Sequence, residues 1–158
     1  MILLDSNVLS ELMRPNPDPH VIRWLDEKSE WDLWISAVTV AEIQLGISLL
    51  PAGNRRKLLL DLSEQMFQEN FPGRCLPFDY EAAFEYALIV AERKHQGHPI
   101  HVEDAQIAAI ARTANLTLAT RNTKDFSGIK ELKLINPWED DPTRIRLRSS
   151  LKRSAFQT

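Results

Sequence analysis

Four acidic side chains stand where the sequence predicts the end of a strand or the start of a helix. Asp5 follows the apolar run in ILLDSNV, Glu42 lies in SAVTVAEIQLGI, Asp104 in VEDAQIAAIA and Asp125 in LATRNTKDF. Carboxylates gathered at one site repel each other and raise one another's pKa, a conflict that a divalent cation removes. Oxygen donors without thiolates suit Mg²⁺ or Mn²⁺. We therefore expect these acids to form one pocket that binds Mg²⁺ (or Mn²⁺).

The elements that must position these acids alternate between short apolar strands and longer segments of helical periodicity, which is typical of an α/β fold with a parallel sheet. The predicted strands are Ile2–Asp5, Leu33–Ser36, Arg74–Phe78, Thr117–Thr120 and Lys133–Ile135. The predicted helices are one that begins near Pro19, followed by Val38–Leu50, Arg55–Phe71, Tyr80–His95 and Val102–Ala114. Ligands bind at the carboxyl ends of parallel strands, so we expect the four acids to meet at that edge.

Each acid also has a purely structural interpretation. Asp5 suits the cap of a short helix, and Thr39 with Glu42 matches the T-x-x-E capping box. Asp104 suits the first turn of a helix because of the helix dipole, and Asp125 suits a turn. Each alternative stays open by itself, but together they would leave unpaired negative charge at one edge of the sheet.

Length and composition restrict the class of protein. The 158 residues predict one domain that needs no disulfide, and the lone Cys75 is expected to pack in the core. The sequence has no secretory signal and no apolar run long enough to cross a bilayer, which predicts a cytoplasmic protein without membrane contact. The net charge of −3 excludes a global attraction to nucleic acid, so a polyanion must be bound by local basic residues or by cations.

Three histidines offer an alternative metal site. His95, His98 and His101 are spaced three residues apart in KHQGHPIHVED, and imidazole is a common zinc ligand. Gly97 and Pro99 interrupt this segment, so the three rings need not share a helical face. A solvated loop is the simpler interpretation, with His101 a candidate neighbour of the acidic pocket.

The ordered set of motifs resembles the PIN-domain ribonucleases, particularly the VapC-type toxins of bacterial toxin–antitoxin pairs. The resemblance is carried by LLDSNVLSEL, SAVTVAEIQLGI, VEDAQIAAIA, LATRNTKDF and INPW, and it covers residues 1–138. It implies a PIN-like three-layer sandwich in which a central parallel sheet of four to five strands is flanked by helices. It also implies metal-dependent cleavage of structured RNA, a homodimer, and inhibition by a cognate antitoxin encoded beside the toxin.

The resemblance further implies roles for single residues. Asp5, Glu42 and Asp104 match the family's acidic triad, with Asp5 and Asp104 as the expected direct metal ligands. Ser6 stands where the family often has threonine, a change that keeps the hydroxyl. Neutral Asn122 stands where many relatives have an acid. The fourth acid of this chain, Asp125, is therefore expected either to act on the site through water or only to cap a turn.

The expected reaction is hydrolysis of a phosphodiester bond by an activated water, which leaves 5′-phosphate and 3′-hydroxyl ends. Glu42 either joins Asp5 and Asp104 as a ligand of the ion or orients that water as a base. Arg121 and Lys124 bracket the site and are expected to hold phosphates that flank the scissile one. The other expected substrate contacts are Ser6, Asn7, Thr120 and Asn122. Solvated helix faces are the preferred interpretation for Arg14, Arg55, Arg56, Lys57, Arg93 and Lys94.

Further expectations concern partners and alternatives. Core or dimer packing, rather than base stacking, is expected for Trp24, Trp31 and Trp34. An apolar groove for the antitoxin is predicted between the early helices, formed by Val8, Leu9, Leu12, Ile43, Leu45 and Ile47. Residues 139–158, with the cluster RIRLRSSLKR, predict a basic extension outside the resemblance. A DNA-directed nuclease and a binding module without catalysis are the alternative functions.

Overall fold

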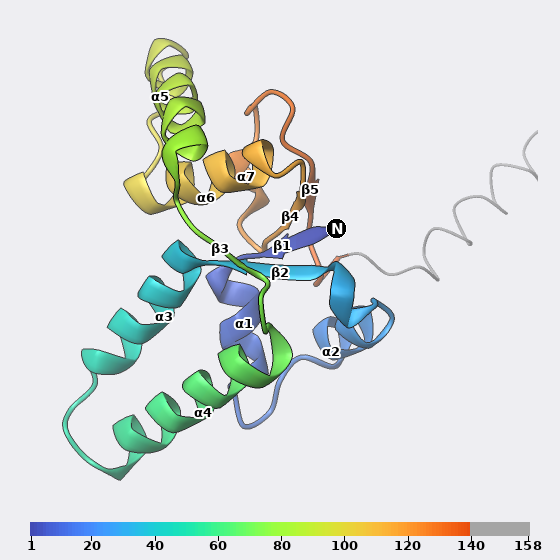
Figure 1. Ribbon diagram of the computed structural model, residues 1–158, viewed down its shortest axis with the longest axis vertical. Helices are drawn as coiled ribbons and strands as arrows, with labels where there is room; N and C mark the ends of the chain where they lie inside the picture. The colour runs from blue at the N-terminus through green and yellow to red at the C-terminus, as the bar shows by residue number, and fades with distance from the viewer. Residues whose placement is uncertain (140–158) are drawn as a thin grey trace, which may run out of the picture.

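The computed structural model describes residues 1–139, which form a parallel β-sheet between two layers of helices (Figure 1). The strands are β1 (Ile2–Leu4), β2 (Leu33–Ser36), β3 (Cys75–Leu76), β4 (Thr117–Ala119) and β5 (Leu134–Ile135). Their order in the sheet is β3-β2-β1-β4-β5, and every neighbouring pair is parallel. The predicted three-layer α/β fold is therefore confirmed. The predicted basic extension lies, from residue 140 onward, outside the described residues.

Helices cover both faces of the sheet (Figure 1). One face carries α1 (Ser6–Leu12), α2 (Pro19–Asp26), α3 (Ala37–Ser48) and α4 (Asn54–Asn70), and a 3₁₀ turn, η1 (Glu30–Asp32), precedes β2. The other face carries α5 (Tyr80–His95), α6 (Val102–Thr113) and α7 (Thr123–Phe126). No helix within the described part of the chain is long and apolar enough to cross a bilayer.

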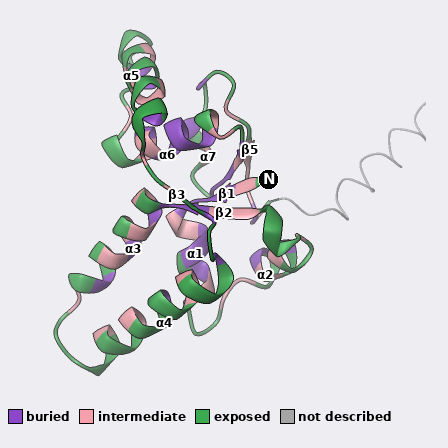
Figure 2. Cartoon of the chain, viewed as in Figure 1, coloured by how far each residue is buried: buried purple, intermediate pink, exposed green. Residues whose placement is uncertain are grey.

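The sheet is buried on both faces because successive side chains of a strand point in opposite directions. Leu3 packs into the cluster beneath α5 and α6, whereas Leu4 packs into the cluster beneath α1 and α3, and both side chains are fully buried. Leu118 and Ala119 divide in the same way on β4. Figure 2 shows the burial concentrated in the strands and in the helix faces turned toward them.

The order of the strands creates a crevice at the end of β1. The chain passes from β1 to β2 and β3 on one side, and then returns to β4 and β5 on the other side of β1. β1 and β4 are therefore neighbours whose following helices lie on opposite faces. Such a switch point leaves an open crevice outside the carboxyl ends of the strands, and it is where open α/β sheets bind ligands.

The predicted helices and strands are all present, but their ends differ from the prediction. Asp5 and Thr120 lie just beyond β1 and β4 rather than within them, and the third strand pairs only at residues 75–76. The predicted capping box of α3 is wrong, because the Ser36 hydroxyl caps this helix by accepting from the Thr39 N–H at 3.0 Å. Glu42 is thereby left without a capping role.

Two further expectations from the sequence are wrong. Cys75 is exposed, because its strand lies at the edge of the sheet. Arg93 is buried rather than solvated, and its guanidinium donates to the backbone carbonyls of His98, Asp125 and Ser127. Arg93 therefore fastens α5 to the segment that contains α7.

Candidate active site

A cleft of about 490 Å³ opens at the carboxyl end of β1, where the strand order reverses. Asp5 from the end of β1, Glu42 from α3 and Asp104 from α6 all line it. The other predicted site residues in its wall are Ser6, Asn7, Arg121 and Asn122. Three of the four acids that were expected to meet, each more than 30 residues from the next, therefore share one cavity, whereas Asp125 does not line it.

Asp5 is fixed by the residues that follow β1 and β4. Its Oδ1 accepts from the Ser6 N–H at 2.8 Å, which caps α1, and its backbone N–H donates to the carbonyl of Ala119 at 3.0 Å. Its Oδ2 accepts from the Thr120 hydroxyl at 2.7 Å and from the Asn7 amide at 3.0 Å. The cap and the site wall are therefore not alternatives, because one carboxylate does both.

Asn7 lines the cleft and Thr120 does not, but the side chains of both are hydrogen-bonded within the protein and position the site. The Asn7 amide donates to Asp5 and to Thr120 Oγ1, and its Oδ1 accepts from the Arg121 N–H at 3.1 Å. Thr120 is fully buried, does not reach the cleft, and accepts a further bond from the Asn122 N–H at 3.0 Å. This network ties the loop after β4 to the start of α1.

The charged form of the Glu42 carboxylate is destabilised by burial and by neighbouring negative charges. Burial raises its pKa from 4.5 to about 7, helped by the negative charges of Asp5, Asp104 and Glu103 and opposed by the Ser6 hydroxyl. Its Oε1 is buried and has no hydrogen-bond partner among the described residues. A buried carboxylate oxygen without a donor is costly, so this atom calls for a proton or a cation.

Asp104 is perturbed in the same direction. Burial raises its pKa from 3.8 to about 6, as do the charges of Asp5 and Asp125, while nearby His101 lowers it. Burial also raises the pKa of Asp5, against the hydrogen bonds that it accepts. His101 does not line the cleft, but it acts on the acidic site through the pKa of Asp104.

Asp125 and Lys124 lie outside the cleft wall. Both belong to α7, and both side chains are exposed. Asp125 still acts on the site through its charge, which contributes to the raised pKa of Asp104.

The three carboxylates suit a hard divalent cation. The donors are all oxygen, the conflict is between like charges, and Glu42 Oε1 lacks a partner. Within residues 1–139 no three His, Cys, Asp or Glu side chains are grouped tightly enough to enclose a metal ion by themselves, and the alternative zinc site at His95, His98 and His101 is therefore absent there. Mg²⁺ commonly takes only one or two carboxylates and completes its shell with water and phosphate oxygens.

Several residues of the cleft were not predicted from the sequence. Ser10, Glu11 and Trp138 line it, and so does Arg14, which had been expected to face solvent. Glu11 is buried and accepts from the Asp18 N–H at 2.7 Å and from Arg14 at 3.2 Å. Part of the signal was present, because positions 7, 10 and 11 share one face of α1, whereas Arg14 lies just beyond the C-cap of this helix.

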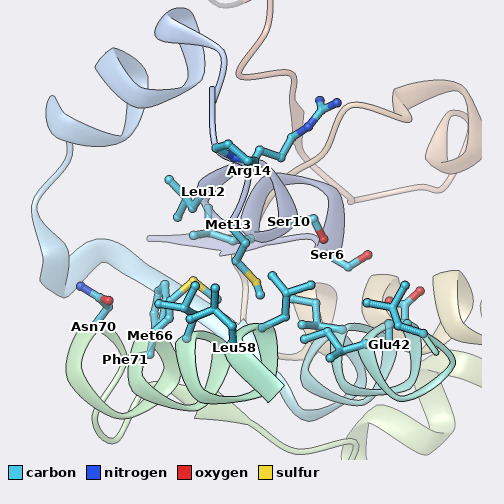
Figure 3. Close-up of a pocket in the computed structure, with 18 of the residues that line it drawn as sticks. Ser6, Ser10, Leu12, Met13, Arg14, Glu42, Leu58, Met66, Asn70 and Phe71 are labelled. Carbon is cyan, nitrogen blue, oxygen red and sulfur yellow. The ribbon is translucent and has the colours of Figure 1, made fainter. Parts of the chain in front are cut away.

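A larger apolar groove, of about 1350 Å³, adjoins the cleft between α1, α3 and α4. Figure 3 shows Met13, the C-cap of α1, and Leu58 and Met66 of α4 directed into it, with Ser6 and Glu42 at one end. The predicted position of a groove between the early helices is confirmed. The assignment of Val8 and Leu9 to this groove is wrong, because both side chains are fully buried in the core. Leu45 does not line the groove either. Residues of α4 do line it, although they were not predicted from the sequence. Ser6, Ser10, Arg14 and Glu42 border both cavities, so the groove leads into the acidic cleft.

Without a bound cation, the protein is expected to gain stability as the pH falls from about 8 to about 5. Glu42 and Asp104 have folded pKa values of about 7 and about 6, above their ordinary 4.5 and 3.8, so the folded state holds protons that the unfolded chain has released. Their contribution is therefore lost as the pH rises through this window. Urea unfolding in EDTA at constant ionic strength measures the slope.

The substitution Glu42→Gln should flatten this slope and raise the free energy of unfolding at pH near 8, because it removes one of the two titrating groups. Asp61→Asn is the matched control, since Asp61 is an exposed acid on α4. A slope in Glu42→Gln equal to that of the unsubstituted protein would contradict the electrostatic description of the cleft.

Comparison with known proteins gives one consistent family. A family model described as PIN domain matches residues 2–132. Toxin FitB of Neisseria gonorrhoeae is 44% identical over 140 residues, which cover 89% of this chain and 100% of that protein. VapC ribonuclease Y4jK of Sinorhizobium fredii is 41% identical over 139 residues, which cover 88% of this chain and 99% of that protein.

The similarity extends to three-dimensional structure. The structure of FitAB bound to the IR36 DNA fragment matches with a TM-score of 0.82 and 42% sequence identity, covering 89% of this chain and 98% of that chain. The matched region contains Asp5, Glu42 and Asp104, the acids that share the cleft. This chain belongs to the PIN-domain family.

Proposed function

We propose that this protein is a metal-dependent endoribonuclease, the toxin of a toxin–antitoxin pair, and that it acts in the cytoplasm. The observation that carries the proposal is the convergence of Asp5, Glu42 and Asp104 in one cleft in which their charges conflict. The names of the relatives, a VapC ribonuclease and a toxin, agree with this proposal. A module without catalysis would have no need to keep three partly desolvated acids together.

Asp5 and Asp104 would hold Mg²⁺ or Mn²⁺, and Glu42 would add its unpartnered Oε1. Such an ion lowers the pKa of water and neutralises charge on phosphoryl oxygens when it is bound. If Glu42 does not bind the ion, it can accept a proton from water, because its pKa in the cleft without a cation is raised to about 7, near neutral pH. Thr120 and Asn7 keep Asp5 oriented toward the cleft through their hydrogen bonds.

Binding of RNA requires positive charge outside the acidic centre. Arg14 and Arg121 line the cleft, and both are exposed enough to reach a phosphate. Arg14 is paired with Glu11 at 3.2 Å, whereas Arg121 forms no ion pair with any described carboxylate. Arg121 is therefore the stronger candidate for a flanking phosphate, with exposed Lys124 farther from the acids.

Purified protein is expected to cleave RNA in Mg²⁺ but not in EDTA, leaving 5′-phosphate and 3′-hydroxyl ends. Asp5→Asn should lower the rate at least a hundredfold, roughly the effect of losing about 3 kcal/mol of transition-state stabilisation. Asparagine is as good a helix cap as aspartate, but its amide nitrogen cannot accept the bonds that Asp5 Oδ2 accepts from Thr120 and Asn7, so thermal unfolding of the variant must show that the fold is kept. Incubation with total RNA and with single-stranded DNA, followed by analysis of the product ends, measures this.

The control for this experiment is Glu103→Gln. Glu103 is an exposed acid in the same turn as Asp104 and does not line the cleft, so this variant should retain cleavage. Activity that survives EDTA or the Asp5 substitution would remove the proposed mechanism. Products with 2′,3′-cyclic phosphate ends would do the same, and cleavage of DNA alone would make the protein a DNA-directed nuclease.

We further propose that the cognate antitoxin occupies the apolar groove between α1, α3 and α4. The groove has an apolar floor and leads into the cleft through Ser6, Ser10, Arg14 and Glu42. A segment that filled the groove would extend over the mouth of the cleft and block access to the acids. Inhibition would then need no change in the fold of the toxin.

A charge placed in the groove should prevent neutralisation by the protein encoded beside the toxin. Leu62→Glu alters a groove residue on α4 that is 41% exposed, whereas Leu49→Glu alters an equally apolar residue, 75% exposed and outside the groove. The first variant is expected to bind the partner at least roughly tenfold more weakly while it still cleaves RNA. Equal neutralisation of both variants would place the antitoxin elsewhere.

Finally, we propose a homodimer that forms through α5. Tyr80, Phe84 and Leu88 follow one another at four-residue intervals on this helix, and each is more than half exposed. The rings of Tyr80 and Phe84 contact each other edge to face at 5.0 Å, which makes a continuous apolar stripe. Such a stripe on a helix is suited to burial against a second helix of the same kind.

Light scattering of the intact protein is expected to give twice the chain mass of 18.1 kDa. Phe84→Glu should reduce it to one chain mass, because a buried unpaired charge in the interface is costly. Leu49→Glu, at the far end of α3, serves as the control and should remain dimeric (Figure 1). A monomeric parent protein, or a dimeric Phe84→Glu variant, would contradict this interface.

A further inference from the structure

The acidic cleft has an aromatic wall that the proposed chemistry does not use. Trp138 and Arg121 line the same cleft as Asp5, Glu42 and Asp104. The Arg121 guanidinium lies over the indole of Trp138, with Cζ at 5.1 Å from the ring centroid. The two side chains come from separate segments, one after β4 and one after β5, so the fold alone brings them together.

Trp138 is held in a fixed position although part of its surface is open. Its backbone N–H donates to Asn136 Oδ1 at 3.0 Å, and the ring packs against the core cluster beneath α1 and α3. Trp138 is half-buried, whereas Pro137 before it is buried. An aromatic ring whose position is set by the core loses little conformational entropy when a ligand stacks on it.

Arg121 is hydrogen-bonded through its backbone, whereas its guanidinium is held only by its contact with the Trp138 ring among the described interactions. Its N–H donates to Asn7 Oδ1 at 3.1 Å, while its exposed guanidinium makes no ion pair with a described carboxylate. The same kind of pair occurs far from the cleft, where Arg74 lies 5.0 Å from the ring of Trp31, but that guanidinium also donates to the backbone carbonyls of Leu33 and Asn70. Arg74 is thus committed to the fold, whereas Arg121 is not.

We propose that Trp138 and Arg121 form a stacking platform for a nucleobase adjacent to the scissile phosphate. This inference rests on the proposed ribonuclease function and specifies its substrate as RNA that is unpaired at the cleft. Unpaired bases stack on aromatic rings and on guanidinium planes, whereas bases inside a duplex are not free to do so. The platform would bind the neutral base, while the charge of Arg121 attracts the neighbouring phosphate toward an acidic centre that would otherwise repel it.

The test uses the full chain with Asp5→Asn, which prevents turnover, and a single-stranded oligoadenylate RNA of roughly a dozen nucleotides. One adenine is replaced in turn by 2-aminopurine, whose fluorescence is quenched when it stacks on an indole. The variants are Trp138→Leu, which removes the ring, and Trp138→Phe, which keeps a smaller one. Arg121→Gln changes an exposed side chain without affecting the core, and Trp31→Leu is the matched control.

Trp138→Leu is expected to weaken RNA binding roughly tenfold and to abolish the quenching at one position of the probe. Trp138→Phe should retain part of both effects, Arg121→Gln should weaken binding, and Trp31→Leu should change neither. Thermal unfolding of each variant separates a loss of fold from a loss of contact. Unchanged binding and quenching in both Trp138→Leu and Arg121→Gln would overturn the platform, as would an equal loss in Trp31→Leu.

The failure of the platform is distinguishable from the failure of the proposed function. If the unsubstituted protein cleaves RNA in Mg²⁺ but the Trp138 and Arg121 variants bind and quench as before, the nuclease proposal stands and the platform is wrong. If the unsubstituted protein cleaves no RNA but the probe is quenched in a manner that depends on Trp138, the platform stands as a binding site without the nuclease.

Discussion

The structure is organised around repulsion among carboxylates that the fold forces to share a small and partly dry space. Asp5, Glu42 and Asp104 come from three different parts of the chain, yet Asp5 raises the pKa of both other acids and Asp104 raises that of Glu42. No described basic residue neutralises them directly, since Arg14 pairs with Glu11 and Arg121 lies over Trp138. The hydrogen bonds from Ser6, Asn7 and Thr120 keep Asp5 in place despite this cost.

At Asp5 the cost of burying a carboxylate is partly offset by hydrogen bonds. The same carboxylate caps α1, accepts from the Thr120 hydroxyl and accepts from the Asn7 amide, so one side chain joins the ends of β1 and β4. Its hydrogen bonds partly offset the effect of burial on its pKa. Glu42 has no comparable support for Oε1, which makes it the most sensitive member of the triad to protons and cations.

Three surfaces around the acidic cleft differ in their chemical character. The apolar groove beside the cleft, the aromatic wall at Trp138 and the apolar stripe on α5 lie on different elements and need not compete for the same partner. The groove and the cleft are nevertheless continuous at Ser6, Ser10, Arg14 and Glu42. Events in the groove can therefore affect the acids directly, by occlusion, without a change of conformation.

The sequence by itself determined the strand and helix alternation, the parallel sheet and the placement of Asp5, Glu42 and Asp104 where strands end or helices begin, because hydrophobic periodicity and caps are local signals. It did not determine that Cys75 lies at a sheet edge, that Arg93 is a buried clamp, or that Val8 and Leu9 belong to the core. Those outcomes, like the meeting of Arg121 with Trp138 and the entry of Glu11 and Arg14 into the cleft, depend on which elements become neighbours. Only the tertiary structure decided them, because contacts between residues far apart in the chain follow from the order of the strands and the packing of helices on the sheet rather than from local propensity.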